Sequence, residues 1–275
     1  IPVGHIEAGL RTWDTTNPFP EELNRRVTGM VSRWHFAPTE LARQNLLADK
    51  VPGKQIIVTG NTVVDALLMT LDKVRKNPPP LPARVEEAIA QKREIILVTG
   101  HRRESFGQGV RNICEGLHRI AQTLPEARII YPVHLNPNVR GPVFELLQDT
   151  PNVYLEDPLP HKNFVRLMQA SNLILSDSGG IQEEGPSLGK PVLIMRDVTE
   201  RPEGVDCGVN MLVGVTPHNI MNQTVRLMTD AAAYAEMSSK PNPYGDGHAS
   251  ERIANRLRGD MCFLRHEATD MLQVA

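Results

Sequence analysis

The sequence has little of several features that would assign a chain to a special class of protein. Only three cysteines occur in 275 residues, aromatic residues make up 4%, and the charges nearly balance at a net charge of −2. Without an excess of basic residues, the chain lacks the electrostatic footprint of a nucleic-acid-binding protein. No apolar run approaches the roughly 18 residues of a membrane-spanning helix. Nucleic-acid binding, membrane insertion and disorder are therefore disfavoured, and a globular chain is expected.

The cysteines and the start of the sequence point to a cellular context. Cys114, Cys207 and Cys262 lie far apart and form neither a CxxC pair nor a Cys/His cluster, so neither a disulfide framework nor a zinc site is expected. This usage is typical of the reducing cytoplasm. The sequence opens on Ile1 rather than Met, inside a strand-like segment, and we expect a piece of a longer protein.

Short apolar runs alternate with stretches in which apolar residues recur at spacings of three and four. Such alternation predicts parallel βαβ units with helices on both faces of a sheet, that is, a doubly wound α/β fold. The expected strands are residues 55–58, 94–98, 127–133, 153–155, 172–175 and 191–195. The expected helices are residues 21–31, 39–49, 62–76, 109–124, 139–148, 163–169, 181–188 and 217–227.

A proline-rich stretch at residues 77–82 predicts a domain boundary, because its four prolines remove backbone donors and stiffen the chain. Only two or three strands precede it, which is too few for an independent sheet. The predicted segments are the C-terminal part of a first Rossmann-like domain (1–70), a connecting helix with the linker (71–92), a complete Rossmann-like domain (93–240) and a C-terminal helical segment (241–275).

The sharpest motif spans residues 173–194 and predicts a strand, a glycine turn, a helix, a tight turn and a strand. Gly179 and Gly180 let a ligand approach the backbone, and the free N–H groups at the helix start suit a diphosphate. In open parallel sheets, ligands lie beyond the carboxyl ends of the strands, where this turn sits. Glu183 and Glu184 point roughly 100° apart, so only one can face the ligand and bind ribose hydroxyls. The alternative is a Ser178 N-cap followed by two solvated glutamates.

Other strand-end loops carry cationic or ionisable side chains. His101, Arg102 and Arg103 follow a predicted strand, where cations complement an anionic leaving group and His101 could donate a proton. The alternative is that these arginines pair with a neighbouring carboxylate or with solvent. Arg201, in a loop expected to be irregular, is a candidate anion or sugar ligand, and His134 follows another strand end.

Two carboxylate–arginine pairs near the start of the chain fit either catalytic residues or surface ion pairs. Glu21 and Arg25, and likewise Glu22 and Arg26, are spaced i,i+4 on a predicted helix. Such pairs are often surface pairs worth about 0.3–0.5 kcal/mol each. Spacing alone therefore does not identify these glutamates as catalytic.

Nine motifs in register resemble those of the bacterial non-hydrolysing UDP-N-acetylglucosamine 2-epimerases, in order from residue 1 to about residue 257. The motifs are HIEAGLR (5–11), PEELNR (20–25), VTGNT (58–62), VTGHRRESF (98–106), YPVHLNPNV (131–139), DSGGIQEE (177–184), GKPVL (189–193), RDVTERPE (196–203) and NPYGDG (242–247).

The resemblance implies a GT-B-like pair of Rossmann-type domains, the first of them incomplete, with a UDP-sugar in the cleft between them. It also implies interconversion of UDP-N-acetylglucosamine and UDP-N-acetylmannosamine by elimination and re-addition of UDP at C1, with proton exchange at C2. Neither a cofactor nor a metal is required by the family mechanism. A cytoplasmic homodimer serving polysaccharide biosynthesis is implied as well, and family members carry a longer N-terminal part with a further catalytic Asp.

Residue roles implied by the resemblance fall into three groups. The substrate-binding group comprises Ser178, Gly179 and Gly180 at the diphosphate, Glu184 at the ribose, Phe164 by the uracil, and Arg201. The catalytic group comprises Glu7, Glu21 and His101. Arg102 and His134 resemble positions that family members use for a second, regulatory UDP-sugar.

Three alternatives to the epimerase stay open on the sequence. A UDP-sugar-dependent glycosyltransferase would share the diphosphate turn, but it should lack the carboxylates Glu7 and Glu21. A non-catalytic UDP-sugar-binding fragment would bind UDP without exchanging hydrogen at C2. A hydrolysing epimerase would release free N-acetylmannosamine.

Overall fold

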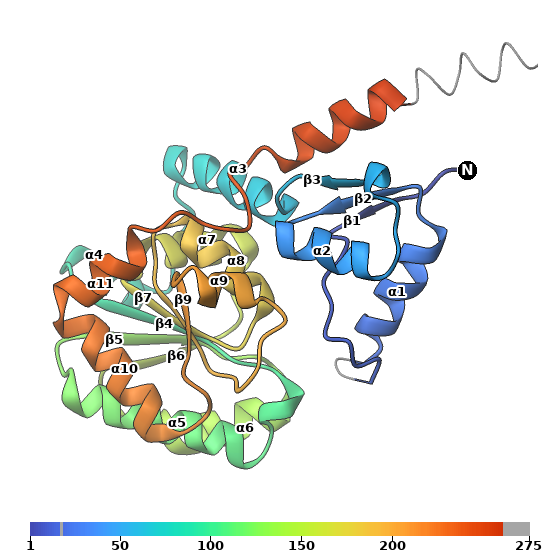
Figure 1. The fold of residues 1–275 in the computed structure, drawn as a ribbon. Coiled ribbons are helices and arrows are strands. Elements are labelled where there is room, and N and C mark those ends of the chain that lie inside the picture. Colours follow the sequence, from blue (N-terminus) through green and yellow to red (C-terminus); the bar gives the residue numbers. More distant parts are fainter. Residues whose placement is uncertain (17–18, 261–275) are drawn as a thin grey trace, which may run out of the picture. The chain divides into compact units, whose positions relative to one another are not determined.

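The computed structural model describes residues 1–16 and 19–260, which form two compact units (Figure 1). Unit 1 comprises Ile1–Ala66 and the chain from Tyr244 onward, and unit 2 comprises Leu67–Pro243. Within this grouping, residues 71–92 lie in unit 2 and the helical residues 249–260 lie in unit 1. The division into domains that the sequence predicts stays a prediction.

Unit 2 is built on a six-stranded sheet in which every neighbouring pair of strands is parallel. The strands, in spatial order, are β6 (Val153–Glu156), β5 (Arg128–Pro132), β4 (Ile95–Thr99), β7 (Leu173–Ser176), β8 (Val192–Ile194) and β9 (Asn210–Leu212). The α/β fold with parallel strands that the alternating pattern predicts is confirmed.

Both faces of this sheet are buried, as the continuous apolar runs of its strands require. Along β4, Ile96 and Val98 pack into one core cluster, while Ile95 and Leu97 pack into another on the opposite face. Helices cover both clusters (Figure 1). The first is covered by α5 (Gln108–Thr123), α6 (Pro137–Leu147), α10 (Pro217–Thr229) and α11 (Ala231–Ser238), and the second by α3 (Thr62–Lys76) from Leu67 onward, α4 (Ala83–Ala90), α7 (His161–Ala170) and α8 (Gly179–Ser187).

Unit 1 holds a smaller parallel sheet, in the order β1 (Gly4–Ile6), β2 (Trp34–Ala37) and β3 (Ile56–Val58). Helices α1 (Glu21–Val31) and α2 (Glu40–Ala48) belong to the same unit. The Asp65 carboxylate accepts hydrogen bonds from the amides of Ala249 (3.1 Å) and Ser250 (2.7 Å), so it caps the helical residues 249–260. This cap ties two segments that are far apart in the sequence.

Several short elements were not predicted from the sequence. β2 and β9 are only 4 and 3 residues long, and His35 and Asn210 interrupt their apolar character. Helix α4 forms within the predicted linker segment, and α9 (Pro202–Asp206) forms where an irregular loop was expected. α11 was missed too. Elements this short show no clear periodicity, so tertiary packing decides them.

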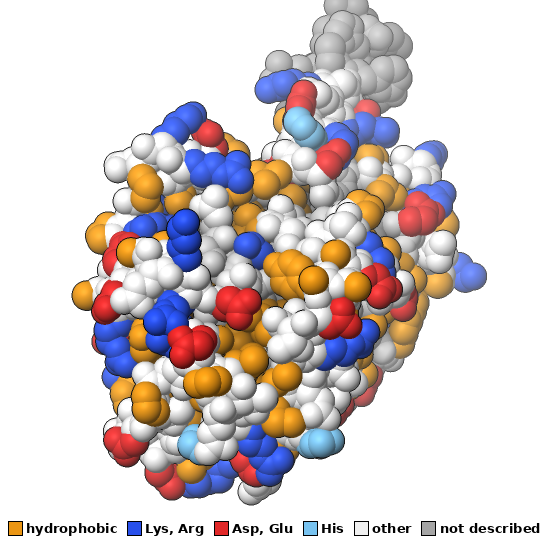
Figure 2. Space-filling model, turned by 90° about the vertical axis from the view of Figure 1, so that its left-hand side faces the viewer, with side chains coloured by type: hydrophobic (Ala, Val, Ile, Leu, Met, Phe, Trp, Pro, Cys, Tyr) orange, Lys and Arg blue, Asp and Glu red, His pale blue; other side chains and the backbone are white. Residues whose placement is uncertain are grey.

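The described helices give no sign of a lipid-spanning segment, and the face drawn in Figure 2 shows no large patch of one charge. Among residues 1–16 and 19–260, no helix combines the length and the apolar content needed to cross a bilayer. On the face in Figure 2, acidic and basic side chains are interspersed. This mixing agrees with the net charge of −2.

A matched pair of glycine substitutions tests the packing of α8 on the sheet. A Cβ at Gly185 would lie 2.4 Å from Cγ2 of Val192 in β8, whereas a Cβ at Gly141 in α6 meets nothing within 4 Å. We expect Gly185→Ala to lower the free energy of unfolding by about 1–3 kcal/mol through overpacking. Gly141→Ala should raise it by up to about 1 kcal/mol through helix propensity. Urea unfolding monitored by circular dichroism measures both, and equal stability of the two variants would contradict the packing.

Candidate functional site

The candidate site of unit 2 lies where the order of the strands reverses. From β4 the chain runs to β5 and β6 on one side, and it then returns through α7 to β7 on the other side of β4. Loops that leave two such neighbouring strands diverge, which opens room for a ligand at the carboxyl ends of the strands. The loop that begins at Gly100 and the turn that begins at Asp177 start at this edge. The two sharpest sequence motifs thus meet there.

Asp177 joins these two loops from a buried position, with 1% of its surface exposed. Its Oδ2 accepts hydrogen bonds from the backbone amides of His101 (2.8 Å) and Arg102 (2.9 Å). Its Oδ1 lies 3.4 Å from Nδ1 of His101. The carboxylate therefore fixes the backbone of the His101 loop and faces the imidazole.

The His101 ring stacks on the His134 ring, which comes from the loop after β5. The ring centroids are 5.5 Å apart and the ring planes are inclined by 23°. Nδ1 of His134 accepts a hydrogen bond from the amide of Asn136 at 3.1 Å, so the hydrogen of a neutral His134 ring sits on Nε2. The structure therefore brings together two histidines predicted from separate motifs.

The first turn of α8 supplies backbone donors. Ser178 is the N-cap residue, yet within the part of the chain that the structure describes its side chain makes no capping hydrogen bond. The amide of Ser178 is bonded to the hydroxyl of Ser176 at 3.0 Å, but the amides at the start of a helix have no partner within the helix. The turn thus offers donors and the positive end of the helix dipole to an anion.

Arg201 packs on the backbone of Gly179. A Cβ at Gly179 would lie 2.5 Å from NH1 of Arg201, so any side chain there would displace the guanidinium group. Nε of Arg201 donates to the Glu183 carboxylate, and NH1 contacts Oε2 of Glu200 at 3.4 Å. Glu183 is 2% exposed, so of the two adjacent glutamates it is the one turned inward. The alternative with two solvated glutamates is therefore wrong.

Glu184 is half-buried beside the open side of Gly180. A Cβ at Gly180 would lie 3.9 Å from Oε2 of Glu184 and 4.0 Å from Oγ of Ser178, so the described protein leaves space there. Burial, as the larger cause, and the charge of the neighbouring Glu183 together raise the pKa of Glu184 to about 7. Glu184 is thus the glutamate of the pair that remains available to a ligand.

The other substrate and regulatory candidates of unit 2 have defined places. Phe164 lies in α7 and packs, partly buried, against the core cluster that contains Leu97 and Ile181. Arg102 is half-buried, and among the described residues its Nε has no hydrogen-bond partner. Its backbone amide is held by Asp177, beside the stacked His101 and His134.

Glu7 of unit 1 directly follows β1 and has an unusual backbone conformation. Its φ of 61° lies in the left-handed region, which non-glycine residues rarely adopt. Holding a non-glycine residue in the left-handed region costs about 1–3 kcal/mol of conformational free energy, and such residues cluster at functional sites. Oε1 of Glu7 accepts a hydrogen bond from Nδ2 of Asn61 at 3.4 Å, and Asn61 follows β3. Glu7 thus lies at the carboxyl edge of the smaller sheet.

Glu21 and Glu22 are adjacent on α1 but have different surroundings. Glu21 is exposed, whereas Glu22 is fully buried and accepts a hydrogen bond from the amide of Thr12 at 3.1 Å. Arg26 lies 3.5 Å from Asp49. The interpretation of Glu22 and Arg26 as a surface pair is therefore wrong. Glu7 and Glu21 belong to unit 1, and the other predicted site residues belong to unit 2.

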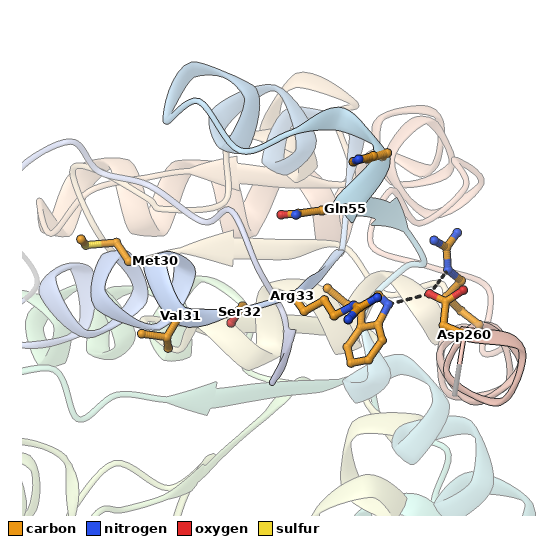
Figure 3. Close-up of a pocket in the computed structure, with 9 residues that line it drawn as sticks. Met30, Val31, Ser32, Arg33, Gln55 and Asp260 are labelled. Carbon is orange, nitrogen blue, oxygen red and sulfur yellow. Dashed lines mark hydrogen bonds and ion pairs between the residues drawn. The ribbon is translucent and has the colours of Figure 1, made fainter. Parts of the chain in front are cut away.

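A cavity of about 560 Å³ in unit 1 lies at the opposite end of its sheet, beside the residues that precede β2 and β3 (Figure 3). Asp260 accepts hydrogen bonds there from Nε1 of Trp34 (2.6 Å) and Nε of Arg256 (2.8 Å). None of the predicted site residues lines this cavity. Among residues 1–16 and 19–260, no group of three His, Cys, Asp or Glu side chains could hold a metal ion.

Sequence reasoning missed two residues that organise the site. Asp177 belongs to the glycine motif, and the sequence by itself assigns it no role, although an Asp directly after a buried strand is a recognisable signal. The inward orientation of Glu183 toward Arg201 had no such signal, because the two residues are 18 positions apart.

The raised pKa of Glu184 predicts a specific dependence of stability on pH. Between the ordinary pKa of 4.5 and about 7 the folded protein holds a proton that the unfolded chain releases, so stability falls as pH rises through this window. We expect Glu184→Gln to match the wild type at pH 4 and to be more stable at pH 8, by up to about 3 kcal/mol. Urea unfolding across this range measures the effect. Glu236→Gln, at an exposed position of α11, is the control that should keep the wild-type profile.

Comparisons with known proteins agree with the geometry of both units. Residues 1–258 match the family model described as UDP-N-acetylglucosamine 2-epimerase. The chain is 54% identical over 261 residues to the UDP-N-acetylglucosamine 2-epimerase of Yersinia pestis, a match that covers 94% of this chain and 69% of that protein. For the Escherichia coli K12 enzyme of that name, identity is 52% over 265 residues, covering 94% and 70%.

A solved structure extends this agreement from the sequence to the fold. The crystal structure of UDP-GlcNAc 2-epimerase from Neisseria meningitidis, bound to UDP-GlcNAc, superposes with a TM-score of 0.86 at 46% identity. The match covers 94% of this chain and 70% of that one. The nine motifs in register therefore pointed to the correct family. This chain belongs to the UDP-N-acetylglucosamine 2-epimerase family.

Proposed function

We propose that this chain interconverts UDP-N-acetylglucosamine and UDP-N-acetylmannosamine. The observation that carries the proposal is the meeting of two strand-end loops at the reversal of strand order. One loop ends in the uncapped first turn of α8, and the other presents His101. A site that combines free amides with an imidazole suits a diphosphate that must be bound and then released as a leaving group.

The nucleotide is recognised by groups around the start of α8. The amides of Gly179 and Gly180 and the hydroxyl of Ser178 bind the diphosphate, which is supported by the lack of a capping hydrogen bond from the Ser178 side chain. Glu184 accepts hydrogen bonds from the ribose hydroxyls, supported by its half-buried position beside the open side of Gly180. Phe164 lies by the uracil, an assignment that rests on the family resemblance.

The chemistry begins at C1, because the hydrogen on C2 has no neighbouring carbonyl to acidify it. The C1–O bond breaks, and its electron pair leaves on UDP. A carboxylate takes the C2 proton, and the C2–H electron pair forms the C1–C2 double bond of a glycal. His101, Arg201 and the α8 amides bind UDP more strongly as its charge grows, which is the differential binding that lowers a barrier.

The reaction closes by the same steps in reverse on the other face of the sugar. A second carboxylic acid protonates C2, and the UDP oxygen forms the new bond to C1. The two carboxyl groups therefore need unlike protonation states. Glu7 and Glu21 are assigned to this pair, and the left-handed backbone of Glu7 supports its assignment.

Further features of the proposal concern regulation and context. Arg102 and His134 are assigned to a second UDP-sugar beside the first, which the stacking of His134 on His101 supports. The free thiols Cys114 and Cys207 support a cytoplasmic location. The homodimer implied by the family stays a prediction.

Proton NMR of UDP-N-acetylglucosamine incubated with the chain in deuterated water tests the function directly. We expect UDP-N-acetylmannosamine to form without any acceptor, with solvent deuterium appearing at C2. Glu21→Gln should lower turnover at least about 100-fold if Glu21 transfers a proton. Glu40→Gln, on an exposed face of α2, is the control.

Each alternative function gives a different result in the same experiment. UDP binding without deuterium at C2 would indicate a non-catalytic fragment. Turnover only with an added sugar acceptor would indicate a glycosyltransferase, and free N-acetylmannosamine with UDP would indicate a hydrolysing epimerase. Wild-type turnover in Glu21→Gln would remove Glu21 from the acid/base pair.

The two adjacent glycines of the turn separate ligand binding from folding. Gly180→Ala should leave stability unchanged within about 1 kcal/mol, because the protein leaves room for a methyl group there. It should weaken UDP binding at least about tenfold by occupying the space of the diphosphate. Gly179→Ala should lower both stability and affinity, because it displaces Arg201. Urea unfolding and calorimetric titration with UDP measure the two effects, and unchanged affinity in Gly180→Ala would place the diphosphate elsewhere.

A further inference from the structure

We propose that Asp177 is a positioning residue that holds the hydrogen of His101 on Nδ1 and so presents Nε2 to the leaving diphosphate. The role of His101 toward a leaving diphosphate rests on the proposed function. The orientation of the His101 ring by Asp177 is argued from the contacts of the two loops alone. The groups concerned are one buried carboxylate, two backbone amides and one imidazole.

The two carboxylate oxygens of Asp177 have different surroundings. Oδ2 already accepts two hydrogen bonds, from the amides of His101 (2.8 Å) and Arg102 (2.9 Å). Oδ1 is buried, and among the described residues it accepts no hydrogen bond. A buried carboxylate oxygen without a donor is costly, so a nearby donor is strongly favoured.

Nδ1 of His101, 3.4 Å away, is the donor that the geometry offers to Oδ1. An ionised carboxylate can only accept, so the hydrogen must lie on the nitrogen that faces it. A small rotation of the imidazole shortens this contact, and catalytic hydrogen bonds often tighten when ligand binds. Nε2 is then the nitrogen left for the ligand, with a hydrogen to give whenever the ring is protonated.

The remaining freedom of the imidazole is limited by its neighbours. His134 stacks on one face of the ring, with the ring centroids 5.5 Å apart. The hydroxyl of Tyr131 donates to the carbonyl of Gly100 at 3.3 Å. At the strand ends, the side chains of Thr99 and Ser176 are hydrogen-bonded at 2.6 Å. The loop that carries His101 is thus held on both sides, and Asp177 decides which nitrogen faces outward.

During elimination, this arrangement favours the departing group. As the C1–O bond breaks, Nε2–H of the imidazolium donates to the UDP oxygen that receives the electron pair. The positive charge on the ring is meanwhile stabilised by the Asp177 carboxylate behind it. The same logic orients the histidine of Ser-His-Asp triads, where an Asp holds the ring in the required tautomer.

Asp177→Asn tests the inference because the Asn side chain keeps one acceptor oxygen for the two backbone amides. In place of the second oxygen, which would accept a hydrogen bond from His101, it has an NH₂ group, which donates one. The side-chain oxygen of Asn should take the Oδ2 position, since two amides require an acceptor there. Its NH₂ group then faces Nδ1 of His101 and donates to it, which moves the imidazole hydrogen to Nε2. We expect a folded variant with turnover reduced about 100-fold or more, and with UDP affinity unchanged within about threefold.

The decisive readout is the tautomer of His101, which ¹⁵N chemical shifts of the labelled imidazole report, with His101→Gln used to assign the signals. The wild type at pH 8 should show the hydrogen on Nδ1, and Asp177→Asn should show it on Nε2. A neutral wild-type ring with its hydrogen on Nε2 would overturn the inference, and this measurement stands even if the variant fails to fold. A wild-type tautomer together with wild-type turnover in Asp177→Asn would overturn it as well.

The result also separates this inference from the proposed function. If the tautomers behave as expected but no UDP-N-acetylmannosamine forms, Asp177 positions His101 and the epimerase assignment fails. If the wild type epimerises but its neutral ring carries the hydrogen on Nε2, the function stands and the positioning role fails.

Discussion

Parallel pairing of β4 with β7 places the starts of two loops at one edge of the larger sheet. The pairing runs in register from Ile96 and Leu173 to Thr99 and Ser176, and both strands end together. Because helices bury both faces of the sheet, only the ends of its strands are open to a ligand. Asp177 then links the two loops through the amides of His101 and Arg102. The site therefore depends on this one strand pairing more than on any single side chain.

Helix α8 shows how tertiary packing can hold a segment of poor helix propensity. Its glycines at 179, 180 and 185 would each cost about 1 kcal/mol relative to alanine in an isolated helix. In the protein, Gly179 accommodates the Arg201 guanidinium and Gly185 allows close approach of Val192. Of these three glycines, Gly180 is the one where an added Cβ would make no contact shorter than 3.9 Å with the described protein. The helix is thus stabilised by its neighbours, and the space beside Gly180 remains for a ligand.

Adjacent carboxylates take opposite environments at two places in the chain. Glu183 is buried against Arg201, while Glu184 is half-buried and its pKa is raised to about 7. Glu22 is fully buried and bonded to the amide of Thr12, while Glu21 is exposed. In both pairs one glutamate is buried and makes a structural hydrogen bond, whereas the carboxylate of the other remains accessible to a ligand. A helix turns by roughly 100° per residue, which makes this division of roles a natural use of neighbouring positions.

The sequence by itself determined the α/β class, most of the longer helices and strands, and the family. Alternating apolar patterns report burial directly, and motifs such as 98–106 and 177–184 keep their order along the chain. It also showed that only one of Glu183 and Glu184 could face a ligand. Only the tertiary structure decided which one, because the orienting partner, Arg201, is distant in sequence. The short strands β2 and β9 and the role of Asp177 likewise depend on contacts between segments far apart in the chain, which no local pattern encodes.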